Sequence, residues 1–316
     1  MQNIETFLKS YFSPSDKIIL ACSTGPDSMY LLYQILETSY KDNLVVCYFN
    51  HKLRPEADEE EKFIEELGKK LGFQVEIGIA NIKAIHEKIP SKSIEEIARE
   101  KRYAFFDAIL HIYKSKYILT AHHLDDKIET FMFNLLRGSK ITGLINMTEK
   151  SGSILRPLLN ITKNEILDYL DKNNLKYFLD KSNLDTEITR NFLRLEIIPK
   201  LGKVNLNFKE NINNFMGYLE SAKEHIDNEV KKFLETFSNE NEELKYFGIN
   251  SFNSLSQFLQ NEVIRYIYFI RNGNSTIGLS ENNIAEIIRF INGKGNKTIK
   301  EIKKLSMKKS GDKIYF

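Results

Sequence analysis

The stretch Ala21-Cys22-Ser23-Thr24-Gly25-Pro26-Asp27-Ser28 decides the fold of this chain. It follows an apolar run at 17–20 and precedes Met29-Tyr30-Leu31-Leu32. This order predicts a buried strand, a tight turn over residues 23–28 and then the first turns of a helix. Such a turn is typical of a phosphate site, because loop amides and the helix dipole attract an anion. An ordinary strand-to-helix turn with an N-capping serine is the alternative.

Asp27 makes the prediction more specific. A carboxylate would repel a phosphate group, so its place in this loop needs a reason. A Mg²⁺ ion that bridges the carboxylate to the phosphates supplies that reason. We therefore expect residues 23–28 to bind a nucleotide with Asp27 as the metal ligand.

Strand and helix patterns alternate between residues 17 and 160. Strands are expected at 17–22, 44–49, 73–79 and 117–121, with helices near 28–38, 56–71 and 93–113. This alternation predicts an α/β fold, a Rossmann-like parallel sheet with helices on both faces. Ligands of such sheets bind beyond the carboxyl ends of the strands, where residues 23–28, 50–54 and 120–123 should meet.

The pattern changes near residue 200. From Phe208 to Phe233, apolar residues recur every three or four positions, which predicts one long helix of about 28 residues. We expect one domain over 1–204 and a smaller, mainly helical domain over 205–316. Residues 297–316 should form short strands around residues 310–312. The net charge of +2 is too small to indicate a partner by itself.

Several classes of protein are disfavoured by composition. Cys22 and Cys47 are the only cysteines and form no C-x-x-C pair, so a thiolate zinc site or a disulfide framework is not expected. A cytoplasmic setting fits. No apolar run approaches the roughly 20 residues of a membrane span, and the N-terminus does not resemble a signal peptide.

A second polar cluster runs from His122 to Thr130. Asp126 and Glu129 lie one helical turn apart, and His122 stands at the preceding strand end. These groups suit an amine substrate, because carboxylates hold an ammonium and one of the groups can accept its proton. A zinc site and a solvated helix start are the alternatives.

Arginines form two further candidate sites. Arg99 and Arg102 lie one turn apart on the helix at 93–113, where a guanidinium can clamp a carboxylate or a phosphate. Arg190, Asn191 and Arg194 share a predicted helix face that suits an RNA backbone. For both groups, a solvated helix surface is the alternative.

Taken together, the motifs resemble a known family. The loop is similar to the S-G-G-x-D-S signature of the PP-loop ATP pyrophosphatases, although Thr24 stands where that family usually has glycine. Its Cβ could crowd a phosphate, or its hydroxyl could donate to one. Within that group, segments in order over about residues 15–200 resemble the tRNA(Ile)-lysidine synthases, and the tail resembles their short form. These segments are 50–54, 98–103, 122–130, 137–138, 156–159, 180–183, 189–194 and 197–199.

The resemblance implies a ligase that uses ATP and Mg²⁺. ATP adenylates O2 of the wobble cytidine in the CAU anticodon of tRNA(Ile). The ε-amine of free L-lysine then attacks C2 and expels AMP, which leaves lysidine. By motif position, Ser23, Thr24, Gly25, Pro26, Asp27 and Ser28 would bind ATP.

The resemblance also implies residue roles. Asp27 would hold Mg²⁺, Arg102 the carboxylate of lysine, and Asp126 and Glu129 its ammonium, with His122 beside them. The domain over 1–204 would be catalytic, and the accessory domain over 205–316 would contact the tRNA. The RNA would also contact four residues, which are Arg137, Arg190, Asn191 and Arg194. No membrane partner is expected, and a homodimer stays open because the sequence does not give the oligomeric state.

Two other functions remain as alternatives. A PP-loop RNA thiolase generally needs a cysteine pair or an iron–sulfur cluster, and neither Cys22 nor Cys47 has a cysteine nearby in the sequence. A non-catalytic nucleotide- or RNA-binding protein on the same fold would explain Thr24. It would leave Asp27, Asp126 and Glu129 without a function.

Overall fold

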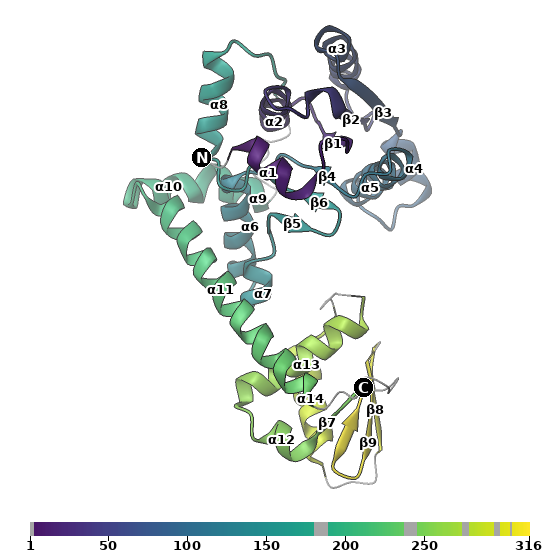
Figure 1. Ribbon diagram of the computed structural model, residues 1–316, viewed down its shortest axis with the longest axis vertical. Helices are drawn as coiled ribbons and strands as arrows, with labels where there is room; N and C mark the ends of the chain where they lie inside the picture. Colours follow the sequence, from purple (N-terminus) through teal and green to yellow (C-terminus); the bar gives the residue numbers. More distant parts are fainter. Residues whose placement is uncertain (1–2, 180–188, 237–244, 274–277, 294–297, 304) are drawn as a thin grey trace. The chain divides into compact units, whose positions relative to one another are not determined.

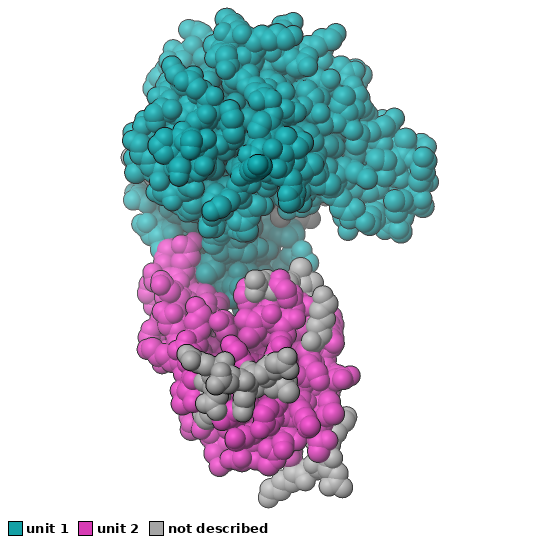
Figure 2. All heavy atoms as spheres, turned by 45° about the vertical axis from the view of Figure 1, so that its right-hand side comes forward, with its two compact units in different colours: residues 1–216 teal, residues 217–316 magenta. Residues whose placement is uncertain are grey.

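The computed structural model describes residues 3–179, 189–236, 245–273, 278–293, 298–303 and 305–316 (Figure 1). The chain forms two compact units, Met1–Met216 and Gly217–Phe316 (Figure 2). The expected division at 204/205 precedes helix α11 (Phe208–Glu235), whereas the units divide inside this helix. Since 28 residues form one continuous helix, α11 belongs partly to each unit.

The first unit is built on a six-stranded sheet in the order β3-β2-β1-β4-β6-β5. Neighbouring strands are parallel except β5, which is antiparallel to β6 at one edge. The predicted parallel α/β sheet is thereby confirmed. β5 and β6 were not predicted, because two residues are too short for a periodic pattern. The strands are β1 (Ile18–Ala21), β2 (Leu44–Asn50), β3 (Gln74–Ile79), β4 (Ile118–Leu119), β5 (Lys150–Ser151) and β6 (Ile154–Leu155).

Strand β1 reads as an unbroken apolar run because both of its faces are covered. Ile18 and Leu20 point into one core cluster, and Ile19 points into another. Helices α1 (Ile4–Tyr11), α2 (Pro26–Leu36) and α8 (Lys163–Lys172) supply the first cluster. Helix α5 (Ile94–Ile112) supplies the second. Continuous hydrophobicity is what a central parallel strand requires.

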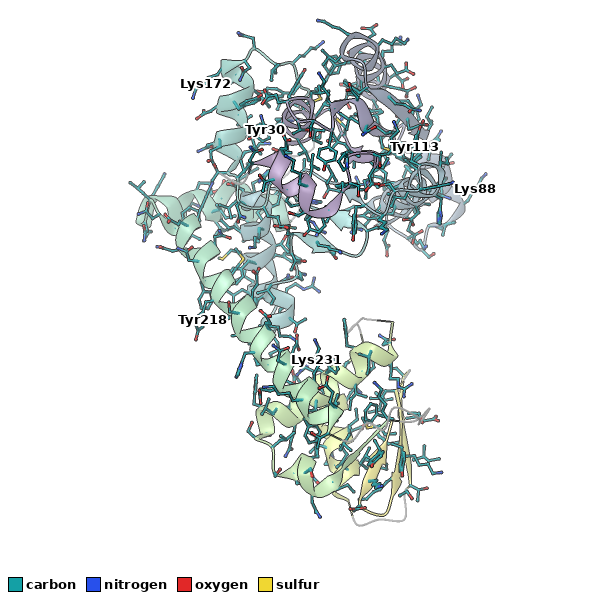
Figure 3. The ribbon with its side chains drawn as sticks, in the orientation of Figure 1. Tyr30, Lys88, Tyr113, Lys172, Tyr218 and Lys231 are labelled. Atoms are coloured by element: carbon teal, nitrogen blue, oxygen red, sulfur yellow. The ribbon has the colours of Figure 1, made fainter. Side chains whose placement is uncertain are left out.

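Local signals define the starts of α5 and α8. Ser93 and Glu96 form a capping box at α5, with each side chain 3.2 Å from the amide of the other residue. The same S/T-x-x-E pattern begins α8 after Thr162. Helix α8 then packs on α2 at Tyr30, which is labelled in Figure 3. The Tyr30 ring lies edge-on to the Tyr169 ring, with centroids 5.1 Å apart.

Helix α6 (Leu124–Leu136) follows β4 after a short turn, close to the expected start at Asp125. This places the first turn of α6 at the carboxyl edge of the sheet. The other helical segments of the unit are α3 (Glu56–Leu71), α4 (Ile82–Lys88), α7 (Ile141–Leu144), α9 (Thr189–Phe192), the π-helical η3 (Leu193–Ile197) and α10 (Ile198–Val204), with a 3-10 turn, η1 (Lys41–Asn43).

The second unit is mainly helical, as predicted. It contains the end of α11 with α12 (Ile249–Asn253), α13 (Gln257–Arg271) and α14 (Glu281–Asn292). These helices pack on an antiparallel sheet in the order β7-β10-β9-β8. Its strands are β7 (Tyr246–Gly248), β8 (Ile299–Ile302), β9 (Leu305–Ser310) and β10 (Lys313–Tyr315), and only β7 lies outside the expected region.

Two lysines of the tail take part in this packing. Lys300 forms an ion pair with Glu286 of α14 at 2.9 Å. Lys309 donates to the carbonyls of Ile291 and Gly293 at 2.8 Å, which satisfies the carboxyl end of α14. None of the described helices combines the length and apolar character that a membrane span needs.

Candidate active site

The turn after β1 is closed by its own serines. Ser28 donates its hydroxyl to the carbonyl of Gly25 at 3.0 Å and accepts the amide of Ser23 at 3.1 Å. Pro26 occupies the first position of α2, and the first helical bond runs from the amide of Met29 to Gly25. The amides ahead of Met29 therefore have no acceptor within the helix, which is the arrangement that binds an anion.

The backbone conformation of Thr24 explains why the PP-loop signature usually has glycine at this position. Its φ is +60°, in the left-handed region that favours glycine, and the residue is fully buried. The hydroxyl donates to the carbonyl of Ser23 at 2.6 Å, so it is engaged within the turn and not directed to a phosphate. The carbonyl of Thr24 accepts the amide of Phe178 at 2.9 Å, which fixes the loop against a later segment.

Asp27 lies on the first turn of α2 between two basic groups. Lys163 Nζ is 2.6 Å from its Oδ1, and His123 Nε2 is 3.5 Å from the same oxygen. Burial acts to raise the pKa of Asp27, but His123 and Lys163 outweigh it and hold this pKa below its usual value. An ionised carboxylate beside an anion-binding turn fits one ligand of a Mg²⁺ shared with phosphates.

The acidic pair of α6 meets an arginine. Asp126 and Glu129 share one face, as the spacing predicted, and Arg194 of η3 reaches both. Its Nη2 is 3.0 Å from Glu129 Oε2 and 3.2 Å from Asp126 Oδ1, and its Nε donates to Glu129 Oε1. Burial raises the pKa of Glu129 against the opposing effect of Arg194. The two carboxylates therefore hold a cation, the property that an ammonium site needs.

His123, to which the sequence assigned no role, lies between the two acidic groups. The His123 side chain is buried, and its Nε2 is 3.5 Å from both Asp27 Oδ1 and Asp126 Oδ2. Burial acts to lower the pKa of His123, but these carboxylates raise it above its ordinary value. His123 therefore connects the predicted metal ligand with the predicted ammonium site.

His122 has a different environment. Its Nδ1 lies 2.9 Å from Thr120 Oγ1. The pKa of His122 is lowered, first by burial and also by the charges of Arg156 and Arg102, while Asp126 acts in the opposite direction. The imidazole is thus kept neutral near pH 7, which suits a proton acceptor.

Two lysines from other helices contact Asp125, in the first turn of α6. Asp125 accepts the amide of Lys163 at 2.9 Å and forms an ion pair with Lys209 of α11. Burial acts to raise the pKa of Asp125, but these partners lower it. Lys163 had no sequence signal of its own beyond its place after the cap residue Thr162, and only the fold brings it to Asp27.

Arg102 lies on α5 without a carboxylate partner among the described residues. Its guanidinium carbon is 5.9 Å from the centre of the Tyr103 ring, and burial lowers its pKa. The charge of Arg102 acts on His51, which follows β2. Burial first, and then the charge of Arg102, lower the pKa of His51 to about 4.

The predicted RNA-binding residues come from two separate segments of the chain. Arg137 is exposed at the far end of α6, with its guanidinium carbon 5.2 Å from the Phe133 ring. Asn191 lies in α9. The side chain of Arg190 and the motif at 180–183 lie outside the described residues, and Arg194 contacts the acidic pair.

The two cysteines are backbone neighbours with separated side chains. The amide of Cys22 donates to the carbonyl of Cys47 at 2.9 Å, yet the thiols belong to core clusters on opposite faces of the sheet. Burial raises the pKa of both thiols, which disfavours the thiolate. Among the described residues, no group of three or more His, Cys, Asp or Glu could hold a metal ion.

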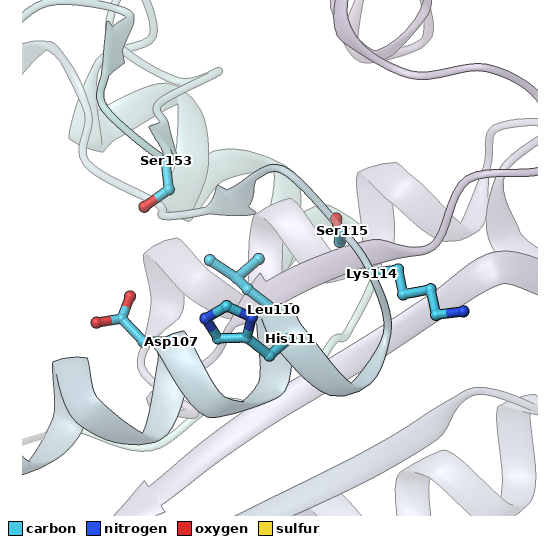
Figure 4. Close-up of a pocket in the computed structure, with 6 residues that line it drawn as sticks. All are labelled: Asp107, Leu110, His111, Lys114, Ser115 and Ser153. Carbon is cyan, nitrogen blue, oxygen red and sulfur yellow. The ribbon is translucent and has the colours of Figure 1, made fainter.

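A surface hollow lies near the amino ends of the sheet strands (Figure 4). Its lining includes Lys114 and Ser115, which precede β4, and Ser153, which precedes β6. These are the amino ends of the strands. Ligands of parallel α/β sheets bind at the carboxyl ends, so the hollow is separate from the candidate active site.

The sheet order, the turn after β1 and the acidic start of α6 are typical of α/β nucleotide-binding proteins, with the candidate site at the carboxyl end of β1. Residues 1–201 match a family model described as a PP-loop domain. This match covers more than half of the 316 residues, and the chain belongs to the PP-loop family.

Three similar proteins are tRNA(Ile)-lysidine synthases by name. A tRNA(Ile)-lysidine synthase from Bacteroides thetaiotaomicron is 37% identical over 203 residues, covering 64% of this chain and 47% of that protein. One from Persephonella marina is 29% identical over 261 residues, covering 81% and 57%. One from Staphylococcus aureus is 32% identical over 258 residues, covering 79% and 59%. The chain therefore spans about half to three fifths of the length of these relatives.

A solved structure has a similar fold. It is a U34-tRNA thiolase from Methanococcus maripaludis with its 4Fe-4S cluster. The TM-score is 0.53 and the sequence identity 19%, over 66% of this chain and 73% of that chain. At this identity the likeness concerns the fold alone.

Proposed function

We propose that this protein is a tRNA(Ile)-lysidine synthase, which ligates lysine to C2 of the wobble cytidine in the CAU anticodon of tRNA(Ile). One observation carries the proposal. His123 lies 3.5 Å from both Asp27, in the anion-binding turn, and Asp126, in the acidic pair. A nucleotide site thus adjoins a cation site, and the names of the similar proteins supply the substrates.

In the first step, the cytidine O2 attacks the α-phosphorus of ATP, and pyrophosphate leaves. We assign binding of the phosphates to the turn at residues 23–28 and the amides of the first turn of α2. The Asp27 carboxylate would hold Mg²⁺, whose chemistry when bound is to neutralise charge on the phosphate oxygens. Lys163, 2.6 Å from Asp27, is a second cation for these oxygens.

In the second step, the ε-amine of lysine attacks C2 and the C2–O bond to AMP breaks. The ammonium must lose protons to become this nucleophile. We assign its binding to Asp126 and Glu129, in the place that the Arg194 guanidinium holds in this structure. We assign proton acceptance to His122, whose pKa is lowered by burial, and binding of the lysine carboxylate to Arg102.

Arg137, Arg190, Asn191 and the second unit are our candidates for contacts to tRNA, and a cytoplasmic setting belongs to the proposal. The thiolase alternative gains no support, because burial raises the pKa of both thiols and keeps them protonated. A non-catalytic binding protein would not need an ammonium site beside the nucleotide turn.

The test is incorporation of labelled lysine into tRNA(Ile) transcript with ATP and Mg²⁺, together with release of AMP and pyrophosphate. We expect modification of the CAU transcript and none of a transcript with U at the wobble position, which has no cytidine to adenylate. Methionine tRNA with the same anticodon should be spared. Absence of lysine from the RNA, or equal labelling of both tRNAs, would refute the proposal.

A further inference from the structure

Arg156 occupies the carboxyl end of β6. It directly follows Leu155, whose partner in the parallel register is Leu119 of β4. Its Nη1 donates to the carbonyl of Thr148 at 2.9 Å, which anchors one side of the guanidinium. Its Nε is buried and has no hydrogen-bond partner among the described residues. The guanidinium is thus held in place through Nη1, while Nε remains available to donate to a ligand.

Neither Arg156 nor Arg102 forms an ion pair with a described residue. Burial is the main cause that lowers the pKa of each. A partly buried cation without a counter-charge is unfavourable, because it has lost water and gained no partner. An anionic ligand group would remove this cost.

The charges of Arg156 and Arg102 both act on the imidazole of His122. The amide of Thr120 donates to the carbonyl of Leu155 at 2.9 Å, so the residues after β4 and β6 lie side by side. Thr120 Oγ1 lies 2.9 Å from His122 Nδ1. The opposite charge of Asp126 also acts on this imidazole. Cationic and anionic groups therefore both lie in the surroundings of His122.

This arrangement favours a carboxylate over a phosphate as the ligand group. The phosphate turn follows β1, whereas Arg156 follows β6, on the far side of β4 from β1. A zwitterion with an ammonium near Asp126 and a carboxylate near the arginines matches both charges around His122. A nucleotide phosphate carries no ammonium group for Asp126.

We propose that Arg156 is a specificity-determining residue that binds, together with Arg102, the α-carboxylate of the amino acid substrate. Arg156 thereby selects an amino acid over a simple amine of the same length. This inference rests on the proposed function and names a part of the same site.

The test compares lysine with 1,5-diaminopentane, which has the same reactive amine and no carboxylate. Incorporation of each into tRNA(Ile) is measured for the wild-type protein and for Arg156→Met. Wild type should prefer lysine strongly. In Arg156→Met, kcat/KM for lysine should fall about 10- to 100-fold, as expected for loss of a hydrogen bond to a charged group, while that for diaminopentane stays unchanged.

Lys101→Met is the matched control. Lys101 lies on the same helix as Arg102, but it is exposed and has no role in the proposed site. It should keep the preference for lysine. Arg156→Lys retains the charge without the planar fork and should fall between wild type and Arg156→Met. If the Met variant does not fold, the Lys variant decides, since an unchanged preference in it would overturn the inference.

Two results with the folded variant would also overturn it. An equal fall for lysine and diaminopentane would make Arg156 a structural residue. A fall in pyrophosphate release from ATP and tRNA without any amine would make it a phosphate ligand. Wild-type protein that releases pyrophosphate but incorporates neither amine would refute the proposed function itself, and with it this inference.

Discussion

The guanidinium of Arg194 lies against the carboxylate of Glu129 in a two-point contact, with Nη2 3.0 Å from Oε2 and Nε donating to Oε1. The fork of an arginine matches a carboxylate in this way and adds directionality to the charge attraction. Glu129 is buried, so the contact neutralises a carboxylate that water does not reach. The ammonium site that we propose is thus closed by a cation of the chain itself.

We expect Arg194→Ala to lower the melting temperature by about 2–4 °C, the change that about 1 kcal/mol causes in a domain of this size. The variant leaves Glu129 buried without a counter-charge. Adding Glu129→Gln to Arg194→Ala should restore most of the lost melting temperature, because a buried neutral amide needs no counter-charge. Thermal unfolding followed by circular dichroism measures this, with exposed Arg137→Ala as the control. Additive losses in the double variant would contradict the pairing.

Asp126→Asn and Glu129→Gln should weaken the use of lysine far more than the use of ATP. A buried ammonium that loses its charge partner costs about 2–5 kcal/mol. The comparison is between kcat/KM for lysine and the KM for ATP in the tRNA modification assay. Asp168→Asn, an exposed carboxylate on α8, is the control. Unchanged lysine kinetics in both variants would show that the ammonium binds elsewhere.

Asp27→Asn should reduce pyrophosphate release from ATP and tRNA to the background rate. The amide keeps the shape of the side chain but loses the charge that a Mg²⁺ ligand supplies. It should also leave Lys163 without its ion pair. Pyrophosphate is measured across a Mg²⁺ series, with retained thermal stability as the control for folding. Wild-type release by the variant would rule out the metal role.

The stability of the protein should fall as pH rises through the pKa of His123. This pKa is raised above 6.5, so the folded protein binds the proton more tightly than the unfolded chain. The stabilisation is complete below about pH 6.5, the unfolded pKa, and is lost as pH rises through the higher folded value. Melting temperatures of wild type and His123→Gln from about pH 5.5 to 8.5 test this. The wild-type advantage should shrink with rising pH, and a constant difference would refute the assignment.

Local patterns predicted most of the architecture. The strands at 17–22, 44–49, 73–79 and 117–121 are all present, because central parallel strands must be apolar on both faces. The helix from Phe208 was predicted from its three-and-four spacing. The short strands β5 and β6 were not, since two residues depend on their neighbours for pairing and not on their own pattern.

The sequence by itself determined the anion-binding turn, the acidic face of Asp126 and Glu129, and the edge of the sheet at which they gather. Spacing along a helix and the order of strands are local properties, so short motifs carry them. Only the tertiary structure decided that His123 lies between Asp27 and Asp126, and that Lys163 and Arg194 pair with the carboxylates. These contacts join residues up to 136 positions apart. Burial and charge at such contacts depend on packing across elements, which no local pattern encodes.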